Sequence, residues 1–103
     1  MSKRLEMLEK MIASGTKDPF AFYAHAMELK SLGRLDESLA AFDRLRGLDE
    51  KYVAQYLMAG GVAQQLGKKD VARGWYEQGI ARAQAAGDGH ALSELQQALA
   101  QLG

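Results

Sequence analysis

Cysteine is absent from this sequence of 103 residues, so disulfide bonds, thiolate zinc sites and cysteine nucleophiles are all excluded. The lack of cysteine fits a reducing compartment. The first residues, Met1 to Glu6, are charged and lack the apolar core of a signal peptide. No run approaches the ~18 consecutive apolar residues of a membrane-spanning helix. We therefore expect a cytoplasmic protein with no membrane partner.

An excess of charge of either sign is also missing, because thirteen basic residues balance thirteen acidic ones. A protein without a positive field has little electrostatic attraction to phosphate backbones, so we expect no nucleic-acid partner.

Residues with metal-binding or catalytic chemistry are few. The two histidines, His25 and His90, are far apart in the sequence and belong to no metal-spaced cluster, and the glycines show no phosphate-loop spacing. We expect His25 to lie partly buried in the core and His90 on the surface, in the first turn of the last helix. The sequence therefore predicts a protein that is not an enzyme, with no catalytic residue, no metal and no cofactor.

Proline occurs once, at Pro19, and β-branched residues are scarce, so the composition favours helix almost throughout. Glycines and the pair Asp18-Pro19 divide the chain into segments whose apolar residues recur every three or four positions. Six helices are predicted, over about 2–14, 19–32, 35–46, 50–66, 70–86 and 88–102. The connections are short, which favours antiparallel neighbours in one compact all-α stack.

An internal repeat is visible around two glycines. The segment Ser31-Leu32-Gly33-Arg34-Leu35-Asp36 resembles Gln65-Leu66-Gly67-Lys68-Lys69-Asp70, which lies 34 positions later. The same offset pairs residues of similar kind elsewhere: Phe22 with Tyr56, Ala26 with Gly60, Leu32 with Leu66, and Phe42 with Tyr76.

A helix–turn–helix repeat of 34 residues with these positions resembles the tetratricopeptide repeat. That family has an aromatic residue early in its first helix, a small residue where the helices cross, a glycine in the turn and an aromatic residue in the second helix. The resemblance implies an all-α, right-handed solenoid of antiparallel helix pairs in a single domain, 1–103. Its parts would be a half-repeat helix at 2–14, repeats at 19–52 and 53–86, and a capping helix at 88–102. His25 stands where the family usually has leucine, and Ser38 replaces a small apolar residue.

The resemblance also implies a function, because such stacks bind proteins or peptides in a concave groove lined by the first helix of each repeat. The residues placed there are Phe20, Tyr23, Met27, Lys30, Leu57, Gly61, Gln64 and Gln65. Family members that bind acidic chaperone tails use Lys, Arg and Asn along this face, and that clamp is absent here. An apolar or amphipathic peptide or helix is therefore the expected ligand.

Helical periodicity supports this face independently of the resemblance. The segment 19–32 carries one apolar stripe through Phe22, Ala26 and Leu29, and a second through Phe20, Tyr23 and Met27. A helix that is apolar on two sides must bury both sides or offer one to a partner. Three occupants of the second stripe stay open: a partner protein, a second copy of this chain in a homodimer, or the N-terminal helix.

Overall fold

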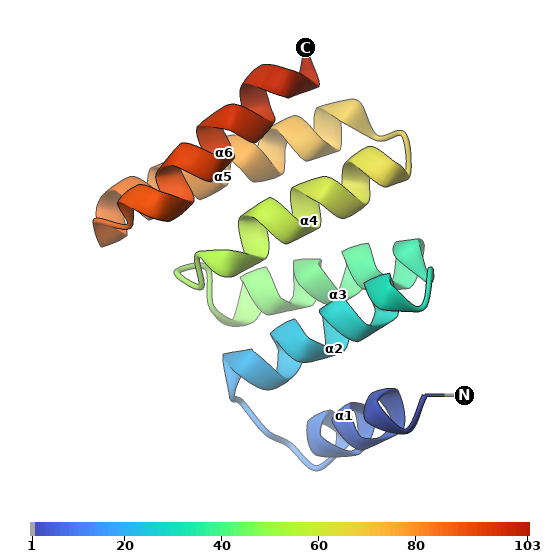
Figure 1. Cartoon of the computed structure of the whole chain (residues 1–103). Helices are drawn as coiled ribbons and strands as arrows, with labels where there is room; N and C mark the ends of the chain where they lie inside the picture. The colour runs from blue at the N-terminus through green and yellow to red at the C-terminus, as the bar shows by residue number, and fades with distance from the viewer. Residues whose placement is uncertain (1) are drawn as a thin grey trace. The chain divides into compact units, whose positions relative to one another are not determined.

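The computed structural model describes residues 2–103 and contains six α-helices (Figure 1). Their bounds are α1 Lys3–Ala13, α2 Pro19–Ser31, α3 Leu35–Leu48, α4 Ala54–Gln65, α5 Lys69–Ala86 and α6 Gly89–Leu102. No strand occurs within the described residues. The predictions of an all-α fold and of six helices are confirmed.

The helices divide between two compact units, which are described separately. The first unit, Met1–Glu50, contains α1, α2 and α3, and the second unit, Lys51–Gly103, contains α4, α5 and α6. The boundary falls two residues before the predicted boundary between the repeats. The prediction of a single domain over 1–103 stays a prediction.

Two helix boundaries differ from those expected. Helix α4 begins at Ala54, not near Glu50, and α3 continues to Leu48, beyond Arg46. The residues before α4 form a turn, in which the backbone N–H groups of Gln55 and Tyr56 bond to carbonyls only three residues back. Val53 provides no side-chain cap. The apolar spacing of this segment therefore extends further than its helical hydrogen bonding.

In the first unit, α2 and α3 form an antiparallel hairpin that turns at Gly33 (Figure 1). Gly33 has a φ of 76°, in the left-handed region that favours glycine. The helices cross at Ala26, which is fully buried. The buried hydroxyl of Ser38 donates a hydrogen bond of 2.8 Å to the Ala26 carbonyl. Phe42 is fully buried and anchors α3, as predicted.

Helix α1 packs against α2 in the same unit. Leu5 and Leu8 are its buried residues. At the start of α1 the Ser2 hydroxyl donates to the Glu28 carboxylate at 2.7 Å, and Arg4 lies 3.8 Å from the same carboxylate. These contacts attach the N-terminal helix to the side of α2 that carries Glu28.

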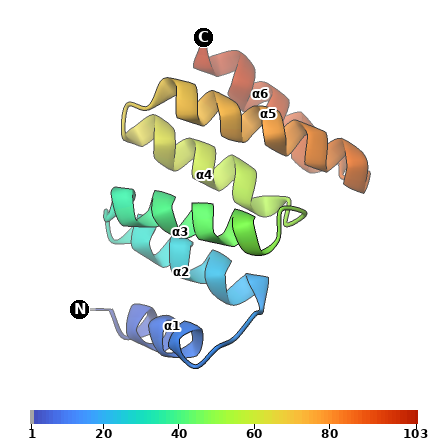
Figure 2. The same ribbon diagram turned by 180° about the vertical axis from the view of Figure 1, so that it is seen from behind.

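In the second unit, α4 and α5 form the corresponding hairpin (Figure 2). A Cβ atom at Gly60 would collide with the Tyr76 ring, so this position requires glycine for the helices to approach. A Cβ at Gly79 would lie 2.5 Å from the Tyr56 Cβ atom. The rings of Tyr56 and Trp75 are 5.8 Å apart between centroids. The core of this hairpin therefore combines large rings with glycines.

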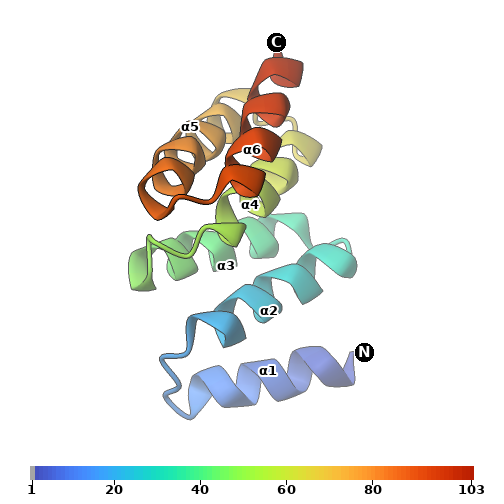
Figure 3. The same ribbon diagram turned by 60° about the vertical axis from the view of Figure 1, so that its left-hand side comes forward.

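Helix α6 packs against α5 and also contacts α4 (Figure 3). Its buried residues are Leu95 and Leu102. The Asp88 side chain caps its first turn by accepting a hydrogen bond of 3.0 Å from the Ala91 N–H group. The amphipathic stripe predicted for this segment thus places its leucines in the core of the second unit.

Candidate functional site

The first half of the predicted binding face lies on α2. Phe20 has an exposed fraction of 59%, whereas Tyr23, Met27 and Lys30 are half-buried. The Tyr23 ring meets the Phe42 ring edge-on, with centroids 6.2 Å apart and planes at 67°. This contact fixes the Tyr23 ring on the hairpin core while leaving part of the side chain exposed.

Helix α1 packs on α2 and leaves Phe20 of this face exposed. Its polar contacts with α2 are made to His25 and Glu28, which helical periodicity places on another side of α2 from Tyr23 and Met27. Of the residues in and beside the second apolar stripe, Ala24 is buried, but Phe20 remains exposed. Helix α1 therefore does not cover Phe20, and for Tyr23 and Met27 the alternative in which the N-terminal helix covers the face stays a prediction.

The second half of the predicted face lies on α4, in the other unit. Leu57 and Gly61 are half-buried, and Gln64 and Gln65 are exposed. The Tyr76 hydroxyl donates a hydrogen bond of 2.6 Å to the Gln64 Oε1 atom, so a core residue of α5 orients a residue of the face. Burial raises the pKa of Tyr76, which keeps this hydroxyl protonated as a donor. No atom lies within 4 Å of a Cβ built at Gly61, so this glycine adjoins open space.

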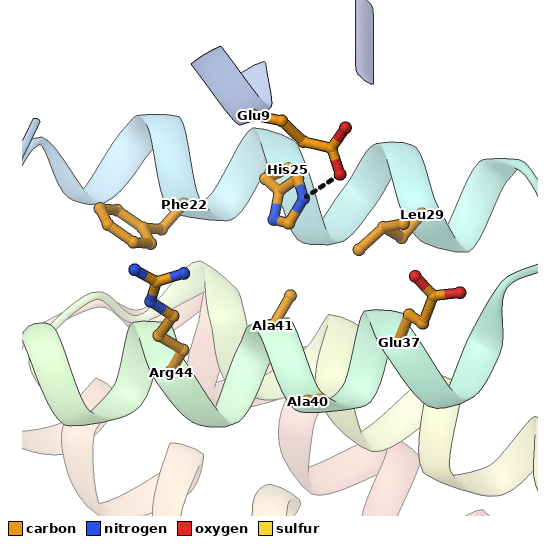
Figure 4. A pocket seen from close by; sticks show the side chains of 8 residues that line it. All are labelled: Glu9, Phe22, His25, Leu29, Glu37, Ala40, Ala41 and Arg44. Carbon is orange, nitrogen blue, oxygen red and sulfur yellow. Dashed lines mark ion pairs between the residues drawn. The ribbon is translucent and has the colours of Figure 1, made fainter. Parts of the chain in front are cut away.

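A pocket of about 280 Å³ lies elsewhere in the first unit, between α1, α2 and α3 (Figure 4). It is lined by Glu9, Phe22, His25, Leu29, Glu37, Ala40, Ala41 and Arg44. The floor is apolar, and charged groups stand around it. None of these residues belongs to the predicted binding face. The signal that could have indicated a pocket is the pair of alanines at 40 and 41, opposite a histidine.

His25 lies at the centre of the pocket with 17% of its side chain exposed, which confirms the expectation of partial burial. Its Nε2 atom is buried and has no hydrogen-bond partner within residues 2–103. An oxygen of Glu9 lies 3.9 Å from this Nε2 atom, which is too long for a hydrogen bond (Figure 4). Burial lowers the pKa of His25, although the Glu9 carboxylate acts in the opposite direction. The neutral imidazole therefore predominates at pH 7.

Two arginines, Arg34 and Arg44, add positive charge near the pocket. The Glu37 carboxylate forms a bidentate pair with Arg34, with distances of 3.0 and 2.6 Å, and the hydrogen bonds lower the pKa of Glu37. The Arg44 guanidinium lies 5.1 Å above the centroid of the Phe22 ring, in cation–π geometry.

Comparison with solved structures shows the family. A crystal structure and a solution structure of a tetratricopeptide repeat domain protein from Salinibacter ruber both match this chain at 36% identity with a TM-score of 0.78. They cover 82% of this chain, and this chain covers 96% and 86% of theirs. The chain belongs to the tetratricopeptide-repeat family. A solution structure from Bordetella parapertussis, at 28% identity, matches 99% of this tetratricopeptide-repeat chain and 89% of its own with a TM-score of 0.85. No family model matches the sequence, and no curated protein matches it either.

Membership of the tetratricopeptide-repeat family indicates a protein-interaction module, and proteins of this fold are typically non-catalytic scaffolds. In residues 2–103 no three His, Asp or Glu side chains are grouped closely enough to hold a metal ion. His90 is exposed and lies 3.2 Å from Glu94. Within the same residues, no helix has the length and apolar character needed to cross a membrane.

Proposed function

We propose that this tetratricopeptide-repeat protein binds a peptide or helix of a partner protein along the first helix of each repeat. The binding residues are Phe20, Tyr23, Met27 and Lys30 of α2, with Leu57, Gly61, Gln64 and Gln65 of α4. The observation that carries the proposal is the exposed Phe20 on the apolar side of α2, beside the half-buried Tyr23 and Met27, although α1 packs on the same helix. Apolar side chains that remain accessible on one helix side are typical of interaction surfaces.

The composition of this face supports an apolar or amphipathic ligand. Lys30 is the one charged residue among the eight, so the face offers a bare acidic tail little attraction. Met27 is flexible and polarisable, which suits contact with apolar side chains of varied shape. Burial of several such groups at about 25 cal/mol per Å² supports association in the micromolar range, after the entropy of binding is subtracted. We infer a non-catalytic role for the chain, without a cofactor.

The test is a double substitution that places charge on both halves of the face, Tyr23→Glu with Leu57→Lys. The natural partner is first identified by affinity capture from the source organism, and its affinity is then measured by calorimetry. We expect the double variant to lose measurable binding while its melting temperature stays near that of the wild type. The matched control, Met7→Glu with Val71→Lys, exchanges two exposed apolar residues on α1 and α5 and should bind normally.

Two results would reject the proposal. Undiminished binding by a folded double variant would place the partner on another face. Unfolding of the double variant would mean that Tyr23 and Leu57 belong to the core.

The same face could instead join two copies of the chain, because its apolar residues are also suited to a homodimer. Light scattering after size exclusion separates the two functions, since the double substitution would convert such a dimer to a monomer.

A further inference from the structure

We propose that the pocket around His25 binds one basic side chain, arginine or lysine, of a partner protein. The site goes beyond the proposed function, because Phe22, His25 and Leu29 lie on the opposite side of α2 from Tyr23 and Met27 by helical periodicity. All the residues involved belong to the first unit, on α1, α2 and α3.

The first support is an unsatisfied polar atom. Buried side-chain nitrogens almost always have a hydrogen-bond partner, and the rare exceptions call for an explanation. The Nε2 atom of His25 is such an exception within the described residues. A neutral imidazole has one nitrogen that accepts and one that donates, so Nε2 can accept a hydrogen bond from a bound donor. The pocket therefore contains an acceptor that the chain itself does not use.

The second support is the position of Glu9. Its Oε2 atom lies 3.9 Å from the His25 Nε2 atom. Nε2 itself is buried, so a bound group reaches it only when the exposed Glu9 side chain turns aside. One nitrogen that carries two or more hydrogens can then lie about 2.9 Å from each of the two acceptors. A guanidinium or ammonium group meets that requirement, and its charge strengthens the bond to the carboxylate. Glu9 faces the pocket in Figure 4, so the bridging point lies at the pocket wall.

The third support is the size and lining of the pocket. Its volume of about 280 Å³ lies just below the usual range of about 300–1,000 Å³ for small-molecule sites, so it suits one side chain. Leu29, Ala40 and Ala41 offer apolar surface, along which the alkyl part of an arginine or lysine can pack. The charged end would then lie near Glu9, because the Glu37 carboxylate on the rim is already paired with Arg34.

The charges of the pocket leave one carboxylate for a cation. Of the two acidic lining residues, Glu37 is paired with Arg34, whereas Glu9 has, among the described residues, only its 3.9 Å approach to His25. The lining arginine, Arg44, lies over the Phe22 ring, whereas Glu9 is the charge that acts most strongly on His25. A carboxylate bound beside His25 would be repelled by Glu9. The centre of the pocket thus selects a positively charged group.

The experiment titrates the full chain with blocked single amino acids and follows the Ala40 and Ala41 methyl groups and the His25 imidazole by NMR. The probes are the N-acetyl amides of arginine and lysine, with those of norleucine and glutamate for comparison. We expect saturable shifts with the arginine and lysine probes, and none with norleucine or glutamate. Equal shifts with norleucine would mean that the pocket binds apolar side chains without selecting for charge. Stronger shifts with glutamate would assign it to anions through Arg44. Either result, or no saturation with any probe, overturns the proposal.

Two variants connect the shifts to the named residues. Glu9→Gln should weaken arginine binding by about fivefold or more, because the bridging carboxylate is removed. Glu6→Gln is its matched control, since it removes the same charge from α1 outside the pocket, and it should leave the affinity unchanged. Ala40→Leu should abolish the shifts by filling the pocket from an exposed position, with the melting temperature checked for folding. Binding that survives both Glu9→Gln and Ala40→Leu would exclude this pocket as the site.

Discussion

The two helix hairpins, α2–α3 and α4–α5, share one sequence register and fill their cores in different ways. At the helix crossing, the first has Ala26 beside Ser38, and the second has Gly60 beneath the Tyr76 ring. Ala41 of the first hairpin corresponds, 34 positions later, to the buried Trp75 of the second. The first hairpin contains the His25 pocket, and the second contains the paired rings of Tyr56 and Trp75.

The comparison shows that the two hairpins place side chains of different size at equivalent repeat positions. A larger side chain at one position accompanies a smaller one at a neighbouring position. Where the second hairpin gains ring volume at Tyr76 and Trp75, it loses side-chain volume at Gly60 and Gly79. Where the first has alanines at 40 and 41, space remains beside His25. Because Ala40 is exposed, this space opens to the surface and is accessible to a ligand.

The largest expected effect follows removal of the ring that anchors either hairpin. Phe42→Ala and Trp75→Ala should each lower the free energy of unfolding by about 3–5 kcal/mol, the usual cost for a fully buried ring. Urea denaturation followed by circular dichroism measures the loss. A loss of less than about 1 kcal/mol at Phe42, well below that range, would mean that the register assigned to the first hairpin is wrong.

The sequence predicts the helices and the repeat better than it predicts the site. The 34-residue offset places Phe42 and Tyr76 in equivalent roles, since both are set by apolar periodicity, which depends on local spacing alone. The offset does not reveal the hydrogen bond from Tyr76 to Gln64, because a hydrogen bond between side chains of two different helices produces no periodic pattern in the sequence. The His25 pocket was missed for a similar reason. A pocket depends on the combined volumes of α1, α2 and α3, which no single segment encodes.

The second prediction exchanges the residues at the two crossings. Gly60→Ala should cost about 1–3 kcal/mol, because the added methyl group collides with the Tyr76 ring. Ala26→Gly should cost about 1–2 kcal/mol, from the lower helix propensity of glycine and the loss of one buried methyl group. Thermal or urea unfolding compares the two variants. The same variants in a Tyr76→Leu background provide the control: the cost of Gly60→Ala should shrink, and that of Ala26→Gly should not.

The third prediction concerns the buried hydroxyl that only the first hairpin has. Ser38→Ala should lower the stability by about 0.5–1.5 kcal/mol, the usual contribution of one hydrogen bond, because the 2.8 Å bond to the Ala26 carbonyl is lost. Ala72→Ser places the hydroxyl at the equivalent buried position of the second hairpin. If the hairpins are equivalent there, the new hydroxyl should bond to the Gly60 carbonyl and Ala72→Ser should be nearly neutral. A large destabilisation by Ala72→Ser would show that the backbone geometries differ at the crossing.

The smallest expected effect is a pH dependence confined to the first hairpin, since His25 corresponds to Ala59 in the second. Burial lowers the pKa of His25 in the folded chain below the ordinary 6.5, so the unfolded chain binds a proton more readily. The stability that the neutral His25 imidazole contributes should therefore be fully present above pH 6.5. It should be lost as the pH drops through 6.5 toward the pKa of His25 in the folded chain. Urea unfolding at a series of pH values measures this slope.

Two variants assign the pH dependence to the imidazole and to its acidic neighbour. His25→Leu should remove the slope, whereas His90→Gln, which changes the exposed histidine, should leave it in place. The Glu9 carboxylate opposes the effect of burial by attracting the protonated imidazole from 3.9 Å. Glu9→Gln should then depress the His25 pKa further and steepen the loss of stability below pH 6.5. An unchanged slope in Glu9→Gln would mean that solvent screens the carboxylate, and it would also weaken the case for Glu9 as the group that attracts a bound cation.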